Sequence, residues 1–563
     1  MDQAVVRSSG VSDHTDERGW RLASAIVGIL LAGLLVWYRF STGCGFGALP
    51  STAELPRASA VGIGLFGNDA SHDSLQHAAW PQQAMRGRWT FFNPFTLDPH
   101  EPLLVNLAAL VVGKLAKVLG RTPLEILNGC GLAAAALLPY MTFLIGRRLG
   151  CSSHAAFVSA VLVAASSGWS AMLELLGAPL ARPGIDVSYL DAVVVSTLLC
   201  YPLIAAAYLV LAVLMLGAAW LDRPHRRSVR LAGLCALAVG NAALGLCHPY
   251  EPAILAGSYV LFWLATLVDP NTRSLESRRR GTTIALAVGA AAVTGYYLWL
   301  SRHPMWRETA VSAVPVPRLA WVIGYGTLLP LAVVGGVICL RSASLERMRW
   351  PLVWAGSVLF LIVGLETAQS KVCAGLHIPL CLLSGVGLEQ FHRAVDRSKW
   401  RRVLGMAAVA IIWASLVYGN IALLNRMRKE VQHIDSGLLQ AARTLEVDYP
   451  ARPPRVLCST DAGRLLAAVT DIRVYAANAW RTPRYYERRR HLGHAGVEVD
   501  FAEAHPYPVP QELALLESLI KENDVDEILV EQWAPAREAL QECRDVRLVG
   551  RYGKWLRYRR IRP

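Results

Sequence analysis

The sequence has few charged residues for its length. Of its 563 residues, 17% are Asp, Glu, Lys or Arg, 54% are hydrophobic, and the mean hydropathy is +0.35. A soluble protein carries roughly 25% charged residues. This shortage argues against a soluble enzyme and against a disordered scaffold. Because the hydrophobic residues also come in runs of about 20, the length that spans a bilayer as a helix, the sequence predicts a polytopic α-helical membrane protein.

The sequence also lacks a C-x-x-C motif, and we expect no cleavable leader; pairing among Cys44, Cys458 and Cys543, which lie outside the hydrophobic runs, stays open. Its eleven cysteines include no C-x-x-C pair, and most lie in hydrophobic runs, where Cys behaves as a small apolar residue. A redox or metal role is therefore not indicated. A polar stretch, residues 1–21, precedes the first hydrophobic run, and no A-x-A-like site follows that run. We expect residues 22–40 to act as a signal anchor.

The net charge of +14 comes from 56 basic and 42 acidic residues. Basic residues of a membrane protein collect in its cytoplasmic connectors, which explains the excess without a nucleic-acid partner. The basic connectors are 222–230, 273–280, 341–349 and 393–402. The connectors between them then face outward: 247–251, 301–318 and 366–371. This places the N-terminus in the cytoplasm and everything after the last run, 403–424, on the external side.

The number of crossings depends on the front half of the chain. Four hydrophobic blocks lie there: 102–119, 124–146, 154–172 and 187–221. The last is 35 residues long with Pro202 in its middle, and proline removes a helical hydrogen bond. Two helices broken at Pro202 give thirteen transmembrane helices in total. Eleven, with one block that does not span, is the alternative.

The C-terminal stretch has the composition of a soluble α/β domain. Strand patterns occur at 455–459, 473–476, 527–530 and 547–550, and helical patterns at 461–469 and 511–522. The predicted organisation is a cytoplasmic tail (1–21), a transmembrane domain (22–424) with a large external loop (41–101), and an external α/β domain (430–563).

The external loop 41–101 is too long to be a simple connector. Asp69 and Asp73 are spaced i,i+4 and share a face if this piece is helical. A carboxylate beside the membrane can act as a general base, so both are candidate catalytic residues. The alternative is an interfacial helix with solvated acids. His72, Asp98 and His100 are candidate substrate-binding residues. The clusters His72/Asp73/His77 and Asp98/His100/Glu101 contain metal-ligand types, but neither matches a spacing such as H-E-x-x-H. A divalent metal therefore stays an alternative without being indicated, and no other cofactor is expected.

The other outward connectors contain further candidate substrate-binding residues. His248 and Glu251 belong to a HPYE stretch, where ionisable residues at the edge of a bundle are functional candidates, although the prolines there also simply make a turn. The remaining candidates are Arg302, His303, Arg307, Gln369, Lys371 and His377. Arginine can hold a phosphate through two hydrogen bonds. The alternatives are contact with lipid headgroups and, for Lys371, snorkelling to the interface.

Several of these segments, taken in order, resemble a known superfamily. The motifs are Asn68-Asp69, Gly87-x-Trp89, Asn93-Pro94-x-Thr96, Pro99-His100, His248-Pro249-Tyr250-Glu251, Gly324-Tyr325-Gly326, Gly375-x-His377-Ile378-Pro379-Leu380 and Thr482-Pro483. Together they resemble bacterial GT-C type integral membrane glycosyltransferases, in a poorly characterised branch, over nearly the whole chain. Each motif is short, so their order carries more weight than any one of them.

The resemblance implies a GT-C-like membrane domain with an active site under the first external loop. Asp69 matches the loop acid that acts as base. The donor would be a polyprenyl-phosphate-linked sugar, the acceptor a glycan, lipid or protein, and the location the bacterial inner membrane with the C-terminal domain in the periplasm. Two rival functions stay open from the sequence. One is a transporter or flippase for a lipid-linked precursor, and the other is a non-catalytic membrane assembly protein of the same fold.

Overall fold

The computed structural model describes most of the chain. The described residues are 12–42, 60–66, 72–169, 173, 202–268, 275–309, 318–364, 375–395, 431–477, 482–498, 509–561 and a few positions between 403 and 425. The chain forms two compact units. A helical unit comprises Met1–Tyr38, Cys130–Tyr296 and Ala313–Lys429, and a loop–α/β unit comprises Arg39–Gly129, Tyr297–Ser312 and Glu430–Pro563.

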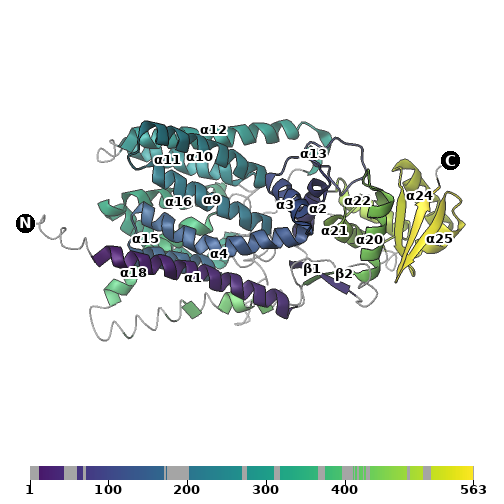
Figure 1. The fold of residues 1–563 in the computed structure, drawn as a ribbon, viewed down its shortest axis with the longest axis horizontal. Coiled ribbons are helices and arrows are strands. Elements are labelled where there is room, and N and C mark those ends of the chain that lie inside the picture. Colours follow the sequence, from purple (N-terminus) through teal and green to yellow (C-terminus); the bar gives the residue numbers. More distant parts are fainter. Residues whose placement is uncertain are drawn as a thin grey trace, which may run out of the picture. The chain divides into compact units, whose positions relative to one another are not determined.

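The fold class predicted from the sequence is confirmed, because the described residues are mostly helical and end in an α/β region. The helices of the helical unit are α1 (Ser12–Ser41), α4 (Pro123–Leu149), α5 (Ser153–Ala165), α9 (Pro202–Leu221), α10 (Arg227–Cys247), α11 (Glu251–Val268), α12 (Glu276–Leu300), α14 (Arg318–Tyr325), α15 (Leu328–Arg341), η4 (Ala343–Met348), α16 (Arg349–Gly364) and α18 (His377–Val395). Some extend by a few residues into the other unit. Figure 1 shows α10, α11 and α12 side by side.

Six of the described helices are long and apolar enough to cross a membrane. They are Glu17–Ser41, Pro123–Leu149, Pro202–Leu221, Arg227–Cys247, Glu251–Val268 and Glu276–Leu300. Pro202 stands at the first turn of α9, where a missing N–H costs no helical hydrogen bond. The predicted run 318–340 is two helices, since the chain turns between α14 and α15 at Gly326, whose φ is +48°. The total of eleven to thirteen helices stays a prediction.

Small residues let helices of the helical unit approach closely. A Cβ at Gly335 on α15 would lie 1.9 Å from the carbonyl oxygen of Leu383 on α18, and one at Gly387 would lie 2.4 Å from that of Leu331. Inside a membrane, where apolar burial does not drive helices together, such backbone contact supplies much of the packing energy. Asn241 adds a polar link, since its side-chain amide donates to the carbonyl oxygen of Leu286 at 2.8 Å.

A buried ionic cluster joins the ends of several helices in the same unit. The Arg279 side chain is 2% exposed, donates to Thr266 Oγ1 at 2.6 Å, and pairs with Glu346. Its Nε lies 3.7 Å from a carboxylate oxygen of Asp222, which also accepts a hydrogen bond from the Tyr259 hydroxyl. Asp222, Arg279 and Glu346 belong to three of the basic connectors that the sequence predicts to be cytoplasmic.

The loop–α/β unit contains both the first long loop and the C-terminal region. Its helices are α2 (His72–Met85), α3 (Leu107–Leu119), α13 (Pro304–Thr309), α20 (Ser436–Asp448), α21 (Thr460–Val469), α22 (Tyr485–His494), α24 (Val509–Glu522) and α25 (Ala536–Glu542). Its strands are β1 (Ala60–Phe66), β2 (Val431–Asp435), β3 (Arg455–Leu457), β4 (Arg473–Val474), β5 (Glu527–Glu531), β6 (Val546–Tyr552) and β7 (Trp555–Arg560). With 13 residues, α3 is about 20 Å long, shorter than the roughly 30 Å core of a bilayer.

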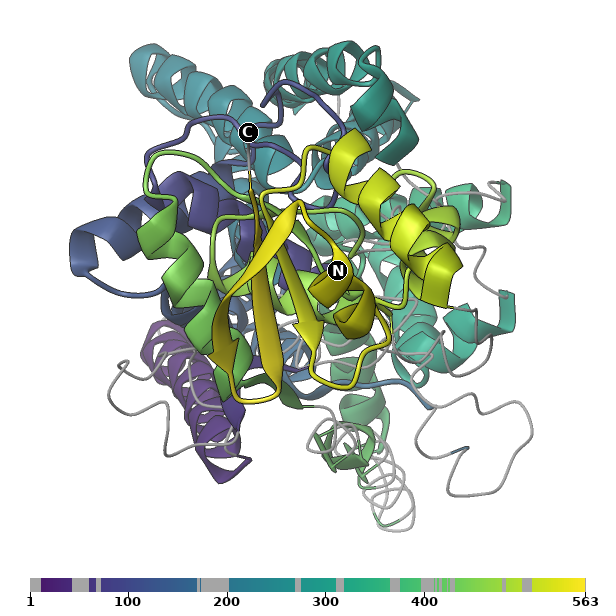
Figure 2. The same cartoon turned by 90° about the vertical axis from the view of Figure 1, so that its right-hand side faces the viewer.

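The C-terminal sheet has the order β4-β3-β5-β7-β6, in which β4, β3 and β5 are parallel and β7 is antiparallel to both its neighbours. Every strand and helix that the sequence predicts here is confirmed, while α20, α22, α25 and β7 are additional. Figure 2 shows the sheet between α20 on one side and α24 and α25 on the other. This is an α/β/α sandwich.

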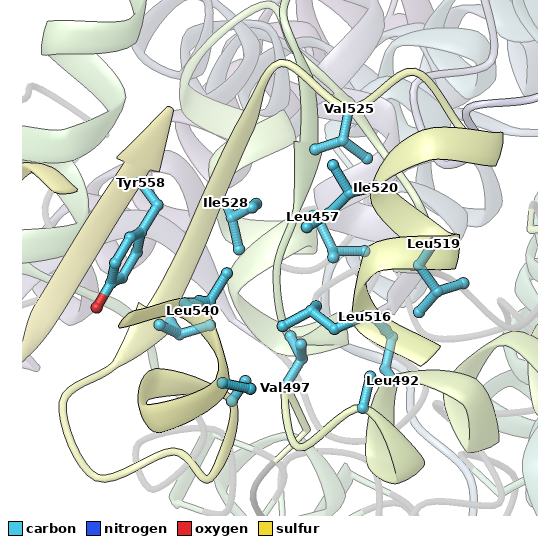
Figure 3. Packing of buried hydrophobic residues seen from close by; sticks show 14 of the residues in the cluster. Leu457, Leu492, Val497, Leu516, Leu519, Ile520, Val525, Ile528, Leu540 and Tyr558 are labelled. Carbon is cyan, nitrogen blue, oxygen red and sulfur yellow. The ribbon is translucent and has the colours of Figure 1, made fainter. Parts of the chain in front are cut away.

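The side chains of β5 point alternately to the two faces of the sheet, which explains why helices cover both faces. Ile528 and Val530 join the core formed with α22, α24 and α25, where Leu516 and Leu540 are 2% exposed or less. Figure 3 shows this packing at close range. Leu529 points to the opposite face, because successive side chains of a strand alternate. A second, two-stranded sheet pairs β1 of the first loop antiparallel to β2. The loop is thus hydrogen-bonded to the start of the C-terminal region.

Candidate active site

The segment after α2 is held against the C-terminal region by side chains at the end of that helix. Gln82 donates to the carbonyl oxygen of Ala468 at 3.0 Å. Gln83 bonds both backbone polar groups of Phe92, so its amide acts like a strand partner. Arg88 pairs with Asp471 at 3.1 Å. Burial raises the pKa of the Asp471 carboxyl, although Arg88 and Arg86 favour its charged form.

The motif Asn93-Pro94-x-Thr96 forms two consecutive side-chain turns. The side-chain amide oxygen of Asn93 accepts a hydrogen bond from the N–H of Phe95, and the Thr96 hydroxyl accepts one from the N–H of Asp98. Asn and Thr favour such turns because their short side chains reach the backbone two residues on. An isolated bridge between Phe91 and Leu104 closes the segment. We call residues 91–104 the motif loop.

His100 is held in one neutral tautomer inside the motif loop. Its Nε2 lies 2.9 Å from the N–H of Asn93 and must accept, because a backbone N–H only donates. A neutral imidazole has one N–H, so Nδ1 donates to the carbonyl oxygen of Asp98 at 2.8 Å. The 3.3 Å approach of Arg473 to Nδ1 is then not a hydrogen bond. Burial lowers the pKa of His100 to about 4, and Arg473 adds to this shift.

Two arginines of the α/β region fix the same loop. Arg488, whose side chain is 4% exposed, pairs with the Asp98 carboxylate and donates to Thr96 Oγ1 and to the carbonyl oxygen of Tyr475. Arg473 donates to the carbonyl oxygen of Asp98 at 2.6 Å. Burial opposes ionisation of Asp98, but the Arg488 guanidinium outweighs it and holds the pKa of that carboxyl below its usual range.

The structure therefore brings Asp98 and His100 together, but with their side chains already engaged inside the protein. Sequence reasoning did not identify Arg473 and Arg488 as their partners. No local signal marks them, since Arg488 lies 390 positions from Asp98 and is the first of three consecutive arginines.

The segment 301–309, which the sequence predicts to face outward, carries cations in the same unit. Arg307 of α13 and Arg302, two residues before that helix, are both exposed, and neither forms an ion pair within the part of the chain that the structure describes. His303 is half-buried, with its ring edge-on to Trp299 at 5.1 Å between centroids. Trp306 packs edge-on to His100 at 6.2 Å, which anchors α13 to the motif loop.

Other candidates lie in the helical unit. His248 ends α10 and Glu251 begins α11, and His248 Nδ1 lies 2.5 Å from the fully buried Glu251 carboxylate. A Cβ on Gly375 would meet Glu251 Cγ at 4.0 Å. The HPYE stretch therefore lies beside the start of the G-x-H-I-P-L stretch. His377, in that second stretch, is buried, and its Nε2 lies 3.1 Å from Ser166 Oγ just past the end of α5.

The segment that follows α5 also contacts the third motif of this unit. Trp169 Nε1 donates to Thr327 Oγ1 at 2.9 Å, and its backbone N–H donates to the carbonyl oxygen of Ile323. Gly326 is packed against the Trp169 ring, where a Cβ would come within 2.9 Å. Three stretches that the sequence likens to one superfamily thus gather within one compact unit.

The remaining candidates are placed only in part. Asp69, Gln369 and Lys371 lie outside the described residues. His72 and Asp73 are the first two residues of α2, which confirms that the segment from His72 is helical. Among the residues that the structure describes, no group of three or more His, Cys, Asp or Glu side chains is arranged to hold a metal ion.

The fold is similar to those of several solved membrane proteins. The oligosaccharyltransferase AglB from Archaeoglobus fulgidus, in complex with an inhibitory peptide and a dolichol-phosphate, aligns with a TM-score of 0.54 and 12% identity over 93% of this chain and 70% of its own. ArnT from Cupriavidus metallidurans, bound to undecaprenyl phosphate, aligns with a TM-score of 0.51 and 12% identity over 94% and 97%.

A third neighbour is the arabinofuranosyltransferase AftD from Mycobacteria, with a TM-score of 0.53 and 13% identity over 96% of this chain and 41% of its own. No protein-family model matches the sequence, and neither does a curated protein sequence. The fold is that of the GT-C glycosyltransferases, as the order of the sequence motifs predicted. At this level of identity the likeness concerns the fold.

Proposed function

We propose that this protein is a membrane glycosyltransferase that moves a sugar from a polyprenyl-phosphate-linked donor to a glycan, lipid or protein acceptor at the external face of the bacterial plasma membrane. The observation that carries the proposal is the ArnT alignment, which covers more than nine tenths of both chains. ArnT was solved with undecaprenyl phosphate and AglB with a dolichol-phosphate. Two GT-C neighbours thus hold the kind of lipid that such a reaction releases.

In the proposed reaction Asp69 takes the proton from the acceptor hydroxyl, with Asp73 one helical turn further on. The acceptor oxygen attacks the anomeric carbon, the bond from that carbon to the phosphate oxygen breaks, and the polyprenyl phosphate leaves with the electron pair. Cations stabilise the departing phosphate most where they are already in place. Arg302 and Arg307 suit this role because they are exposed and unpaired within the described residues, and Lys371 is a third candidate.

In the helical unit, the Glu251 carboxylate lies 2.5 Å from His248 Nδ1 and holds the imidazole in place. His248 and Glu251 stay predicted substrate-binding residues. The neutral His100 has both ring nitrogens occupied within the motif loop, so we assign His100 and Asp98 a positioning role, holding the loop that follows the catalytic acids.

Native mass spectrometry of the purified full chain with added undecaprenyl phosphate tests the donor. We expect a one-to-one adduct whose dissociation constant rises tenfold or more in Arg302→Ala/Arg307→Ala. Loss of one charge-assisted hydrogen bond, worth about 1.5–3 kcal/mol, already accounts for a tenfold change. The matched control is Arg226→Ala/Arg227→Ala, since these arginines are equally exposed but lie on a connector predicted to be cytoplasmic.

Equal weakening by both pairs would mean nonspecific charge attraction, and absence of the adduct would remove the lipid donor from the proposal. Asp69→Asn separates binding from chemistry. It should keep the lipid adduct and abolish sugar transfer, and full transfer by this variant would take Asp69 out of the mechanism.

A further inference from the structure

The topology of the C-terminal sheet creates a crevice between β3 and β5. From β3 the chain passes through α21 to β4 on one side, whereas from β5 it passes through α25 to β6 on the other side of the sheet. The connections that leave the carboxyl ends of β3 and β5 therefore run in opposite directions. In open α/β sheets, ligands bind in the crevice at this switch point.

A cleft of about 300 Å³ lies at this point. Ser459 lines it from the N-cap of α21 and Asp461 from the first turn of that helix. Leu529 and Glu531 line it from the end of β5, and Lys554 from the turn between β6 and β7. The volume is at the lower end of small-molecule pockets, which run from about 300 to 1,000 Å³. The space suits one small ring and is too small for a dinucleotide.

The cleft is not built for a phosphate. Helix N-termini attract anions, but the N-terminus of α21 is already occupied by a carboxylate of the protein. Glu498 accepts hydrogen bonds from the backbone N–H of Thr460 at 2.7 Å and from its hydroxyl at 2.8 Å. The Glu498 side chain is 4% exposed, so it is a fixed part of the wall. A phosphate group would meet this negative charge.

Most of the charges that line the cleft are matched within the protein. Glu498 has Arg489 at 3.4 Å, Asp461 has Arg464, and Glu531 has Lys554 at 2.5 Å. The fourth lining carboxylate, Asp435, accepts a hydrogen bond from the backbone N–H of Leu438. With these partners counted, the wall has an excess of one negative charge, which is small for the binding of a charged amine and unfavourable for an acid. Carboxylates with one ionic partner still offer further acceptor sites, and these suit hydroxyl donors.

Apolar side chains form the rest of the lining. Leu438, Leu465, Val497 and Trp555 face the same space, and Lys554 lies over the Trp555 ring at 5.4 Å. A ligand that fits must present hydroxyls on its edge and a carbon-rich face. We propose that this cleft binds a single uncharged sugar ring, as a free saccharide or as the end of a glycan. The proposal does not depend on the lipid donor or on the reaction proposed above.

Saturation-transfer NMR on the full chain in detergent micelles tests the cleft. The probes are the methyl glycosides of glucose, galactose, mannose, N-acetylglucosamine and arabinofuranose, with inorganic phosphate and spermidine as competitors. The test variant is Glu531→Ala/Lys554→Ala. Removing both partners leaves no unpaired charge, and a surface pair contributes only about 0–1 kcal/mol to stability. The matched control is the exposed pair Arg484→Ala/Glu487→Ala, which does not line the cleft.

We expect at least one glycoside to give a saturable signal that neither competitor removes. Its dissociation constant should rise at least tenfold in the Glu531/Lys554 variant and stay unchanged in the control. A silent panel overturns the proposal, and so does a signal that both variants preserve. Competition by phosphate or by spermidine would reassign the cleft to an anion or to an amine.

Discussion

Arg488 is the side chain whose loss should most disturb the motif loop, residues 91–104. Its guanidinium joins the Asp98 carboxylate, Thr96 Oγ1 and the carbonyl oxygen of Tyr475. Removing one partner of a fully buried ion pair costs about 3–5 kcal/mol. The Asp98 side chain is 34% exposed, so water screens part of this, and we expect Arg488→Ala to lower the free energy of loop opening by about 2–3 kcal/mol.

Hydrogen exchange measured by mass spectrometry on the full chain reports this quantity directly. When exchange follows local opening, a loss of about 2–3 kcal/mol speeds it roughly 30- to 150-fold in peptides that cover the motif loop. Arg488→Lys should give a smaller effect, since an ammonium retains the charge of the guanidinium but not its planar fork of donors.

The matched control is Arg490→Ala on the same helix, because Arg490 is exposed. Exchange in the motif loop should not change in this variant. If Arg488→Ala left the loop protected, or if Arg490→Ala exposed it equally, the loop would not be held by the network around Asp98.

Three further predictions follow from buried groups and close contacts. The pKa of His100 is about 4 in the fold and about 6.5 when unfolded, so the stability that neutral His100 gives the motif loop is complete above pH 6.5 and is lost as the pH falls towards 4. Between pH 7 and 5, the free energy of loop opening, measured by hydrogen exchange and corrected for intrinsic exchange rates, should drop by at most about 2 kcal/mol. His100→Gln should remove this pH dependence. Arg279→Ala leaves the buried carboxylates of Asp222 and Glu346 without their cationic partner. It should lower the free energy of unfolding by about 3–5 kcal/mol and the melting temperature by several degrees. Arg280→Ala, at the exposed neighbouring residue, should leave the melting temperature unchanged. Gly335→Leu should separate α15 from α18, because even a Cβ would collide with the Leu383 carbonyl. Fluorescence-detected size-exclusion chromatography should then show aggregation or loss of the folded peak. The control Gly356→Leu should keep the folded peak, since a Cβ there meets nothing within 4 Å.

Local patterns in the sequence were sufficient for much of the fold. The strand at 527–530 and the helix at 511–522 were predictable because hydrophobic side chains recur there with the period of each element, and β5 and α24 confirm them. The same method did not identify α22, whose sequence YYERRRHLGH is polar on all sides, or α25, which has only seven residues. Their positions are set by packing on the sheet.

Hydropathy also gave one long run where the structure has two helices. Residues 318–340 are apolar throughout, but the backbone at Gly326 has a positive φ and separates α14 from α15. A glycine within an apolar run has the same hydropathy whether it continues a helix or ends one. In this chain the Trp169 ring packs on Gly326. The two residues are more than 150 positions apart, so a hydropathy average over neighbouring residues cannot register their contact.

The candidate site shows the same limit for chemistry. Residue type and position in an outward loop selected Asp98 and His100 together with Arg302 and Arg307, and nothing in the sequence separates the two pairs. The structure does separate them. His100 hydrogen-bonds to the Asp98 carbonyl oxygen and the Asp98 carboxylate pairs with Arg488, whereas Arg302 and Arg307 are exposed and have no ion pair to any described residue.

This difference gives the two pairs opposite expected phenotypes. Asp98→Asn weakens the bond to Arg488, so it should raise hydrogen exchange in the motif loop before it changes affinity for undecaprenyl phosphate. Arg302→Ala/Arg307→Ala should leave exchange in that loop unchanged while lipid affinity falls. If both variants altered both measurements together, the loop and the cations would have to be regarded as one binding element, and the positioning role assigned to Asp98 and His100 would be wrong.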